Sequence, residues 1–296
     1  MLPNRIALRS CDRYFEAMLR AKKGGSIHSI FQSAINFQAE GELFTILSGS
    51  SPSAPYTGNV KEALDFTTLG LKPSEPVRVN ASVLSLSPLV EVSLAGRKLV
   101  ELKREQYPFS SALSQALHIF DQWVKEQKAP RGCLYFYQQK IFGKTHPPNL
   151  LADMTGQRIE AWLACLRPEN PAMPQLKRLL GAGEGLTPAG DDFFCGVYAA
   201  LDGLELEFAA QTALSLRQAL APEITVLSTT DVSKQMIKAQ LEGLMSAAHS
   251  RFKEAMLCNP AKLREALSDL EQMGYSSGLD FAVGMAVAIR HILEMK

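Results

Sequence analysis

The sequence lacks any apolar run long enough to cross a membrane. The best candidate, Phe281 to Ile289, is nine residues long and lies between Asp280 and Arg290, whereas a membrane-spanning helix needs about 20 residues. The first residues become charged before an apolar segment develops, so the N-terminus does not resemble a secretory signal. We therefore expect no membrane partner.

An excess of charge of one sign is also missing. The 296 residues carry 31 Lys and Arg against 30 Asp and Glu, which gives a formal net charge of +1. Nucleic-acid binding usually requires a basic surplus, so nucleic acid is not an expected partner. With 46% hydrophobic and 21% charged residues, the composition is that of a folded globular protein and excludes a disordered or low-complexity chain.

Cysteine and histidine are scarce, with five of each, and neither forms a familiar metal or redox pattern. The cysteines are odd in number and include no C-x-x-C pair, which argues against a disulfide framework or a cysteine zinc site. The histidines show no H-x-x-x-H or H-E-x-x-H spacing. These absences favour a reducing, cytoplasmic location and specify no cofactor.

The first hundred residues show the short apolar runs and frequent turns of β structure. Residues 26–37 and 43–47 are expected strands, joined by a polar hairpin connection that contains Gly41. Further short strands are expected at 77–79, 82–86, 90–94 and 99–102. Prolines punctuate this region and disfavour helices in it. The pattern predicts a small barrel or sandwich.

The hydrophobic period changes to that of a helix after about residue 109. Apolar residues from Leu113 to Val124 recur at helical spacing in a segment that ends near Gln127. The apolar run 133–137 fits either a strand or a helix, and 150–166 is again helix-like. Later helices are expected at 190–202, 207–220, 231–245, 247–257, 261–273 and 278–293.

These segments predict an α+β protein. A small β-barrel-like N-terminal unit is followed by a mainly α-helical C-terminal unit. We expect the β-rich unit to span residues 1–145 and to end in a helix, and the helical unit to span residues 146–296.

The helical half contains a glycine-rich segment, GAGEGLTPAGDD, over residues 181–192. Its glycines can adopt positive φ and let a ligand approach the backbone, and its Thr-Pro dipeptide fits a helix start. Free N–H groups at a helix start suit phosphate or carboxylate. The segment matches neither a Walker loop nor the dinucleotide fingerprint, and a flexible linker with a capped helix is the alternative. Its candidate anion-binding residues are Gly183, Gly185, Thr187 and Gly190.

The same pattern recurs 88 residues later. GDDFFCGVYAAL from Gly190 and GLDFAVGMAVAI from Gly278 both contain Gly-x-Asp-Phe-x-x-Gly followed by an apolar helix. In each, the second glycine, Gly196 or Gly284, follows an aspartate by four residues and allows close helix contact. We hypothesise that the two helices cross tightly and bring their N-termini to one cleft. Chance recurrence of glycine and alanine is the alternative.

The aspartates of the repeated pattern, Asp192 and Asp280, are the candidate catalytic residues. Asp191 points about 100° away from Asp192 on a helix; it is a candidate anion-site residue, although complementing the helix dipole is its favoured role. An aspartate beside bound phosphate repels it unless Mg²⁺ intervenes or the aspartate accepts an amide N–H, so Mg²⁺ is the one cofactor that the pattern suggests. Arg178 and Arg290 are interpreted as solvated ends rather than anion partners.

Hydroxyl-bearing segments complete the candidate anion-binding residues. Ser276 and Ser277 precede Gly278 at the start of the second helix, where Ser277 also fits a capping box. Thr229 and Thr230 lie in STTDVSK, whose hydroxyls can donate to phosphate oxygens and whose lysine can neutralise them. Capping of the following helix is an equal alternative for this segment.

These segments resemble the signature blocks of the AllH-like family. The resemblance is carried by GAGEGLTPAGDDFFCG, TTDVSK, GYSSGLDFAVG and the N-terminal IFQSAINF, and it is strongest over residues 179–284. It implies a β-barrel-like N-terminal part and a helical C-terminal part. It also implies a subunit of oxamate carbamoyltransferase, which acts with two other subunits in allantoin and purine breakdown and interconverts oxalurate plus phosphate with oxamate plus carbamoyl phosphate.

The resemblance implies a small anionic substrate, namely oxalurate, phosphate or carbamoyl phosphate, and other enzyme subunits as partners. The backbone N–H groups of the glycine segments would then hold the anions, and Asp192 and Asp280 would orient the carbamoyl NH₂ or hold a metal. Two alternatives stay open. The chain could be a non-catalytic assembly subunit whose glycines serve helix packing, or a stand-alone enzyme for another phosphorylated or carboxylated metabolite.

Overall fold

The computed structural model describes residues 4–295, which divide into two compact units. Among these residues, one unit contains 4–103 together with Met245–Ala247, and the other contains Arg104–Leu244 and 248–295. The division follows Lys103 rather than residue 145. The helix that the sequence assigned to the end of the first unit, α2 (Ala112–Glu126), packs instead on α10 (Leu263–Glu271) and α11 (Ser277–Glu294).

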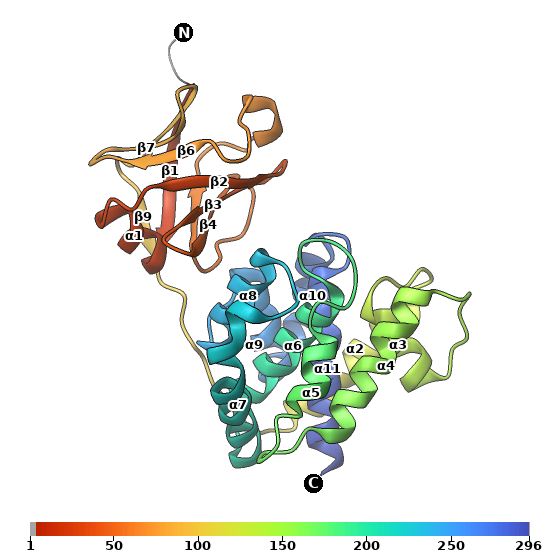
Figure 1. The fold of residues 1–296 in the computed structure, drawn as a ribbon. Helices are drawn as coiled ribbons and strands as arrows, with labels where there is room; N and C mark the ends of the chain where they lie inside the picture. The colour runs from red at the N-terminus through yellow and green to blue at the C-terminus, as the bar shows by residue number, and fades with distance from the viewer. Residues whose placement is uncertain (1–3, 296) are drawn as a thin grey trace. The chain divides into compact units, whose positions relative to one another are not determined.

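The N-terminal unit is an eight-stranded barrel, shown in red to yellow in Figure 1. Hydrogen bonding runs in the order β5–β4–β3–β2–β6–β7–β8–β1, and β1 then pairs with β5, which closes the sheet into a ring. The expected barrel is therefore confirmed. The strands are β1 (Asn4–Asp12), β2 (Gly25–Ile30), β3 (Ala34–Ala39), β4 (Glu42–Leu47), β5 (Thr57–Val60), β6 (Pro76–Val79), β7 (Val83–Ser87) and β8 (Val90–Ser93), with β9 (Lys98–Val100) parallel to the end of β1.

Several parts of the N-terminal unit differ from the sequence expectation. Residues 26–37 form parts of two strands, because the chain reverses where the Phe31 N–H bonds the Ala34 backbone oxygen. Strands β1 and β5 and helix α1 (Arg13–Arg20) were not predicted. Buried Asp12 joins them, because its carboxylate caps α1 and also accepts the N–H of Thr57 in β5 at 3.2 Å.

The C-terminal unit is mainly helical, as expected. The apolar run 133–137 belongs to a helix, and the helix expected over 231–245 ends at Leu241, because Gly243 turns the chain with a φ of 75°. A two-residue pairing joins β10 (Tyr107–Pro108) to β11 (Leu204–Glu205). Besides α2, α10 and α11, the helices are α3 (Cys133–Phe142), α4 (Leu150–Cys165), α5 (Met173–Leu179), α6 (Ala189–Gly203), α7 (Glu207–Leu220), α8 (Asp231–Leu241) and α9 (Ala247–Leu257).

The two helices that carry the repeated pattern, α6 and α11, are the central helices of this unit (Figure 1). Every residue of α6 from Gly190 to Gly203 is buried, and α11 is buried without interruption from Gly278 to Ala286. A helix that is apolar on all sides is stable only inside a core. The other helices of this unit pack around α6 and α11 and bury them. Within residues 4–295, no helix has both the length and the apolar character that crossing a membrane requires.

Candidate functional site

Helices α6 and α11 cross at their repeated glycines. A Cβ atom on Gly196 would lie 2.0 Å from the backbone oxygen of Phe281, and one on Gly284 would lie 2.1 Å from the backbone oxygen of Phe193. Each glycine therefore faces the backbone of the other helix, at the residue that follows the aspartate. The expected tight crossing is confirmed, and it brings the first turns of the two helices together.

Asp192 lies in the first turn of α6 and is 1% exposed. The hydroxyls of Thr187 and Ser277 favour the charged form of its carboxylate, so both the glycine-rich segment and the start of α11 lie beside it. Its Oδ2 atom has no hydrogen-bond partner among the described residues. Burial, followed by the charge of Asp280, raises the pKa of Asp192 well above its usual range, and the two hydroxyls oppose this shift.

Asp280 lies in the first turn of α11 and is completely buried. Its Oδ1 atom accepts the N–H of Cys133, at the start of α3, at 2.5 Å. Its Oδ2 atom has no partner within residues 4–295. Burial raises the pKa of Asp280 to about 7, although the Cys133 N–H, the Ser276 hydroxyl and the Arg131 charge act in the opposite direction. The two aspartates thus form a buried acid pair in which burial disfavours the charged form of both carboxyl groups.

The turn before α3 completes the surroundings of the acid pair. Gly132 has a φ of 51°, and a Cβ atom there would lie 2.1 Å from the Asp280 Oδ1 atom, so only glycine lets the carboxylate reach the Cys133 N–H. The guanidinium carbon of Arg131 lies 5.3 Å from the centre of the Tyr275 ring. Arg131, Gly132, Cys133 and Tyr275 were not among the predicted site residues.

The glycine-rich segment presents two free amides. Among the described residues, the N–H groups of Gly183 and Gly185 have no hydrogen-bond partner, and both residues have positive φ, 119° and 87°. Gly190 differs, because its N–H bonds the backbone oxygen of Ala182 at 2.8 Å. A Cβ atom on Gly190 would lie 2.2 Å from the backbone oxygen of Leu179, so packing alone requires glycine there.

Asp191 faces away from the acid pair and holds the glycine-rich segment. Its carboxylate accepts the N–H of Gly181 at 2.7 Å and the hydroxyl of Ser233 at 2.5 Å, and it also accepts the hydroxyl of Thr229. The carboxylate is completely buried, and burial raises the pKa of Asp191 against the effect of these three donors. Asp191 thus links the glycine-rich segment to α8.

The second threonine has a similar structural use. The Thr230 hydroxyl donates to the backbone oxygen of Leu186 and accepts the N–H of Ser233 at 3.0 Å, which caps α8. The hydroxyls of Thr229 and Thr230 are therefore engaged within the chain, and their contact with an anion stays a prediction. Gly278 is packed closely as well, since a Cβ atom there would lie 2.2 Å from the backbone oxygen of Leu270.

Other reactive or charged groups of the helical unit have structural surroundings. Burial raises the pKa of Cys133 and Cys195 well above the usual range, so both thiols stay protonated and are poor nucleophiles. Arg290 pairs with Asp121 at 2.7 Å, and Arg178 is exposed on α5. Over residues 4–295, no three His, Cys, Asp or Glu side chains gather as a metal site would require.

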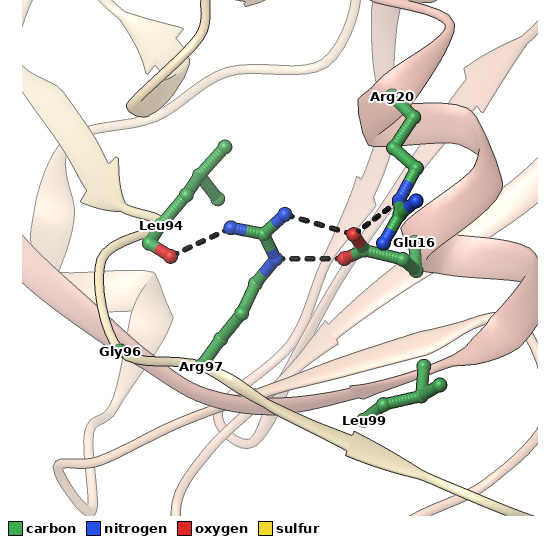
Figure 2. A pocket seen from close by; sticks show the side chains of 6 residues that line it. All are labelled: Glu16, Arg20, Leu94, Gly96, Arg97 and Leu99. Carbon is green, nitrogen blue, oxygen red and sulfur yellow. Dashed lines mark hydrogen bonds and ion pairs between the residues drawn. The ribbon is translucent and has the colours of Figure 1, made fainter.

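A second candidate location is a pocket of about 300 Å³ in the N-terminal unit (Figure 2). Arg97 donates to both carboxylate oxygens of Glu16, at 2.7 and 3.0 Å, and to the backbone oxygen of Leu94 at 2.7 Å. Arg20 donates to Glu16 at 2.8 Å. The hydrogen bonds from Arg97 are the main cause that lowers the pKa of Glu16 to about 2. The guanidinium of Arg97 is therefore engaged within the chain.

Two family models match the chain. One, described as oxamate carbamoyltransferase subunit AllH, matches residues 179–289, which contain the glycine-rich segment, α6 and most of α11. The other, the AllH family N-terminal domain, matches residues 6–99, which contain all of the barrel except the start of β1. A comparison with curated proteins and one with solved structures gave no match. The chain therefore belongs to the AllH family, whose description is that of a subunit of oxamate carbamoyltransferase.

Proposed function

We propose that this chain carries out the carbamoyl transfer of an oxamate carbamoyltransferase, with Asp192 and Asp280 as the acid–base pair. The reaction interconverts oxalurate plus phosphate with oxamate plus carbamoyl phosphate. The observation that supports this most directly is the acid pair itself, in which two buried carboxyl groups each keep one oxygen without a partner among the described residues. Buried polar atoms are rarely left unpaired unless a ligand or solvent satisfies them.

The chemistry needs one proton to be taken up and one to be supplied. A phosphate oxygen attacks the terminal ureido carbon of oxalurate, and the bond from that carbon to the oxamate nitrogen breaks. Hydrogen phosphate loses its proton, and the departing nitrogen gains one, so the atoms and charges balance. One carboxylate of the pair can accept the first proton, while the other, protonated carboxyl donates the second.

The pKa of about 7 for Asp280 suits the donor role, because the folded protein then keeps this carboxyl protonated up to neutral pH. A buried carboxyl that is neutral also reduces the repulsion of a phosphate nearby. The raised pKa of Asp192 indicates the same difficulty in ionising both groups together. We therefore assign one shared proton to the pair in the resting protein.

The anions would be held by donors of the glycine-rich segment and by hydroxyls beside the pair. The free amides of Gly183 and Gly185 can donate to a phosphate or to the attacked carbonyl oxygen as its negative charge develops. The hydroxyls of Thr187 and Ser277 lie beside Asp192 and that of Ser276 lies beside Asp280, and all three would orient the aspartates toward the substrate. Asp191, Thr229, Thr230, Gly190 and Gly278 would act by keeping this arrangement in place.

The test is the oxamate-dependent release of phosphate from carbamoyl phosphate, corrected for the release without oxamate. The chain is assayed together with the subunits that copurify with it, with and without Mg²⁺. Asp192→Asn and Asp280→Asn should each lower the rate by roughly 10²- to 10⁴-fold. Asp231→Asn is the matched control, because Asp231 also lies in a first helical turn, that of α8, but its side chain is 56% exposed.

The rate with Asp231→Asn should equal that of the wild type. A wild-type rate with either variant of the acid pair would refute the proposal and favour an assembly role for the chain. A loss of rate in a variant that tryptophan fluorescence shows to be folded would support the proposal.

A further inference from the structure

Arg131 is a half-buried cation beside the acid pair. Its positive charge acts on the carboxylate of Asp280. It also lies two residues before Cys133, and the backbone N–H of Cys133 donates to that same carboxylate. Within residues 4–295 it makes no ion pair. Other arginines of the helical unit do: Arg104 pairs with Asp202 and Arg264 pairs with Glu126.

The way Arg131 is held leaves its hydrogen-bond donors available. The guanidinium carbon lies 5.3 Å from the centre of the Tyr275 ring, which is a cation–π contact. A cation–π contact uses none of the five N–H donors of the guanidinium, and none of them donates to a group within residues 4–295. Tyr275 itself is 77% exposed, so the ring supports the cation at a surface that a small molecule can reach.

The proposed reaction favours a cation at this place. Both substrates are anions, since oxalurate carries a carboxylate and phosphate carries its own charge, and the site already contains two carboxyl groups. Neutral amides and hydroxyls can share hydrogen bonds with an anion but do not cancel its charge. A guanidinium offers both the charge and a two-pronged set of donors that matches two oxygens of a carboxylate or phosphate.

We propose that Arg131, supported by Tyr275, is the residue that receives an oxyanion of the substrate beside the Asp192–Asp280 pair. This inference rests on the proposed function. It assigns Arg131 to binding and leaves the proton transfers to the aspartates. The carboxylate of oxamate and inorganic phosphate both offer a pair of negatively charged oxygens to Arg131. Separate titrations with the two compounds distinguish which of them Arg131 binds.

The experiment is a calorimetric titration of the full chain, with the subunits that copurify with it, using oxamate in one series and inorganic phosphate in the other. Arg131→Gln should raise the Kd for at least one probe by roughly 10- to 100-fold, as expected for the loss of a charged hydrogen bond. Arg131→Lys should recover part of the affinity. Tyr275→Ala should weaken binding by about two- to fivefold, as expected for an exposed cation–π contact.

Arg178→Gln is the matched control, because Arg178 is an exposed arginine just before the glycine-rich segment and should not change either Kd. An unchanged Kd for both probes with a folded Arg131→Gln variant would overturn the inference, as would the absence of any binding by the wild type. The probe whose Kd changes identifies the oxyanion.

The two proposals fail in different ways. If Arg131→Gln binds both probes normally while Asp192→Asn abolishes transfer, the anion contact is wrong and the acid pair stands. If Arg131→Gln weakens binding while both aspartate variants keep the wild-type rate, the anion contact stands and the catalytic assignment is wrong.

Discussion

Replacement of Gly284 by alanine should destabilise the helical unit by a predictable amount. The new methyl group would lie 2.1 Å from the backbone oxygen of Phe193, whereas Cβ atoms essentially never approach another atom closer than 3.0 Å. Helices α6 and α11 must therefore separate by about 1 Å at this point, and overpacking of this kind costs roughly 1–3 kcal/mol. We expect the upper part of that range, because backbone cannot rotate away. Alanine returns about 1 kcal/mol through its helix propensity, which leaves a net loss of about 2 kcal/mol.

The chain offers a selective probe for this measurement. Its two tryptophans, Trp123 and Trp162, are both buried in the helical unit, so their fluorescence during urea unfolding follows that unit alone. Gly156→Ala is the control, because the nearest atom to its Cβ atom would be a ring carbon of the Phe136 side chain, at 3.2 Å, and not backbone. The control should change the free energy of unfolding by less than about 1 kcal/mol.

The refuting result is a Gly284→Ala protein as stable as the wild type or more stable, because the helices would then not touch at this glycine. A double variant with Gly196→Ala sharpens the test. Each substitution separates the same two helices, so the pair should cost less than the sum of the single losses. Additive losses would mean that the two glycines act at independent contacts.

Two further predictions concern pH. The stability of the helical unit should fall as the pH rises from about 4 to about 7, since Asp280 loses its proton near 3.8 when unfolded but near 7 when folded. Urea unfolding followed by tryptophan fluorescence should show that the free energy of unfolding depends less on pH in Asp280→Asn than in the wild type. An equal pH dependence in both proteins would contradict the raised pKa of Asp280. The barrel should behave oppositely, because Glu16 titrates near 2 when folded and near 4.5 when unfolded. Hydrogen exchange in β1 and α1 should quicken as the pH falls from 4.5 toward 2, after correction for the intrinsic rate, and Glu16→Gln should remove that change.

The sequence was sufficient for the parts of the site that depend on local pattern. Gly196 and Gly284 each follow an aspartate by four residues, so the periodicity of a helix places the glycine and the carboxyl group one turn apart on nearby faces. The internal repeat then suggested that the two helices meet. Their crossing and the approach of Asp192 to Asp280 follow from that one pattern.

The sequence could not provide contacts between distant segments. The Cys133 N–H and the Asp280 carboxylate lie 147 residues apart, and no repeat or spacing connects them. Arg131 was missed for the same reason. The sequence offered one indication of this turn, since Gly132 precedes an apolar run. Its positive φ and the Asp280 carboxylate that occupies the place of a side chain depend on the tertiary structure.

The same distinction explains the barrel. Strand β1 contains charged residues and has little strand character of its own, and its conformation is set by pairing with β5 and β8.

Asp191 in the helical unit is a similar case, because its contacts also depend on distant segments. Its position in a first turn fits a helix-dipole role, but its bonds to Ser233 and Gly181 come from segments that the pattern left unconnected.

The closure of the barrel through β1 has a consequence for how the chain folds. β1 pairs with β8, and its first residue, Asn4, lies opposite Val90, so most of the barrel sequence separates the two partners. Contacts between such distant segments form slowly because a long loop must first close. Until then, the edge of β1 exposes unpaired backbone groups to other chains. We therefore expect newly made chains to be most prone to aggregate before β8 has docked, and a chaperone that shields strand edges to raise the yield of folded protein.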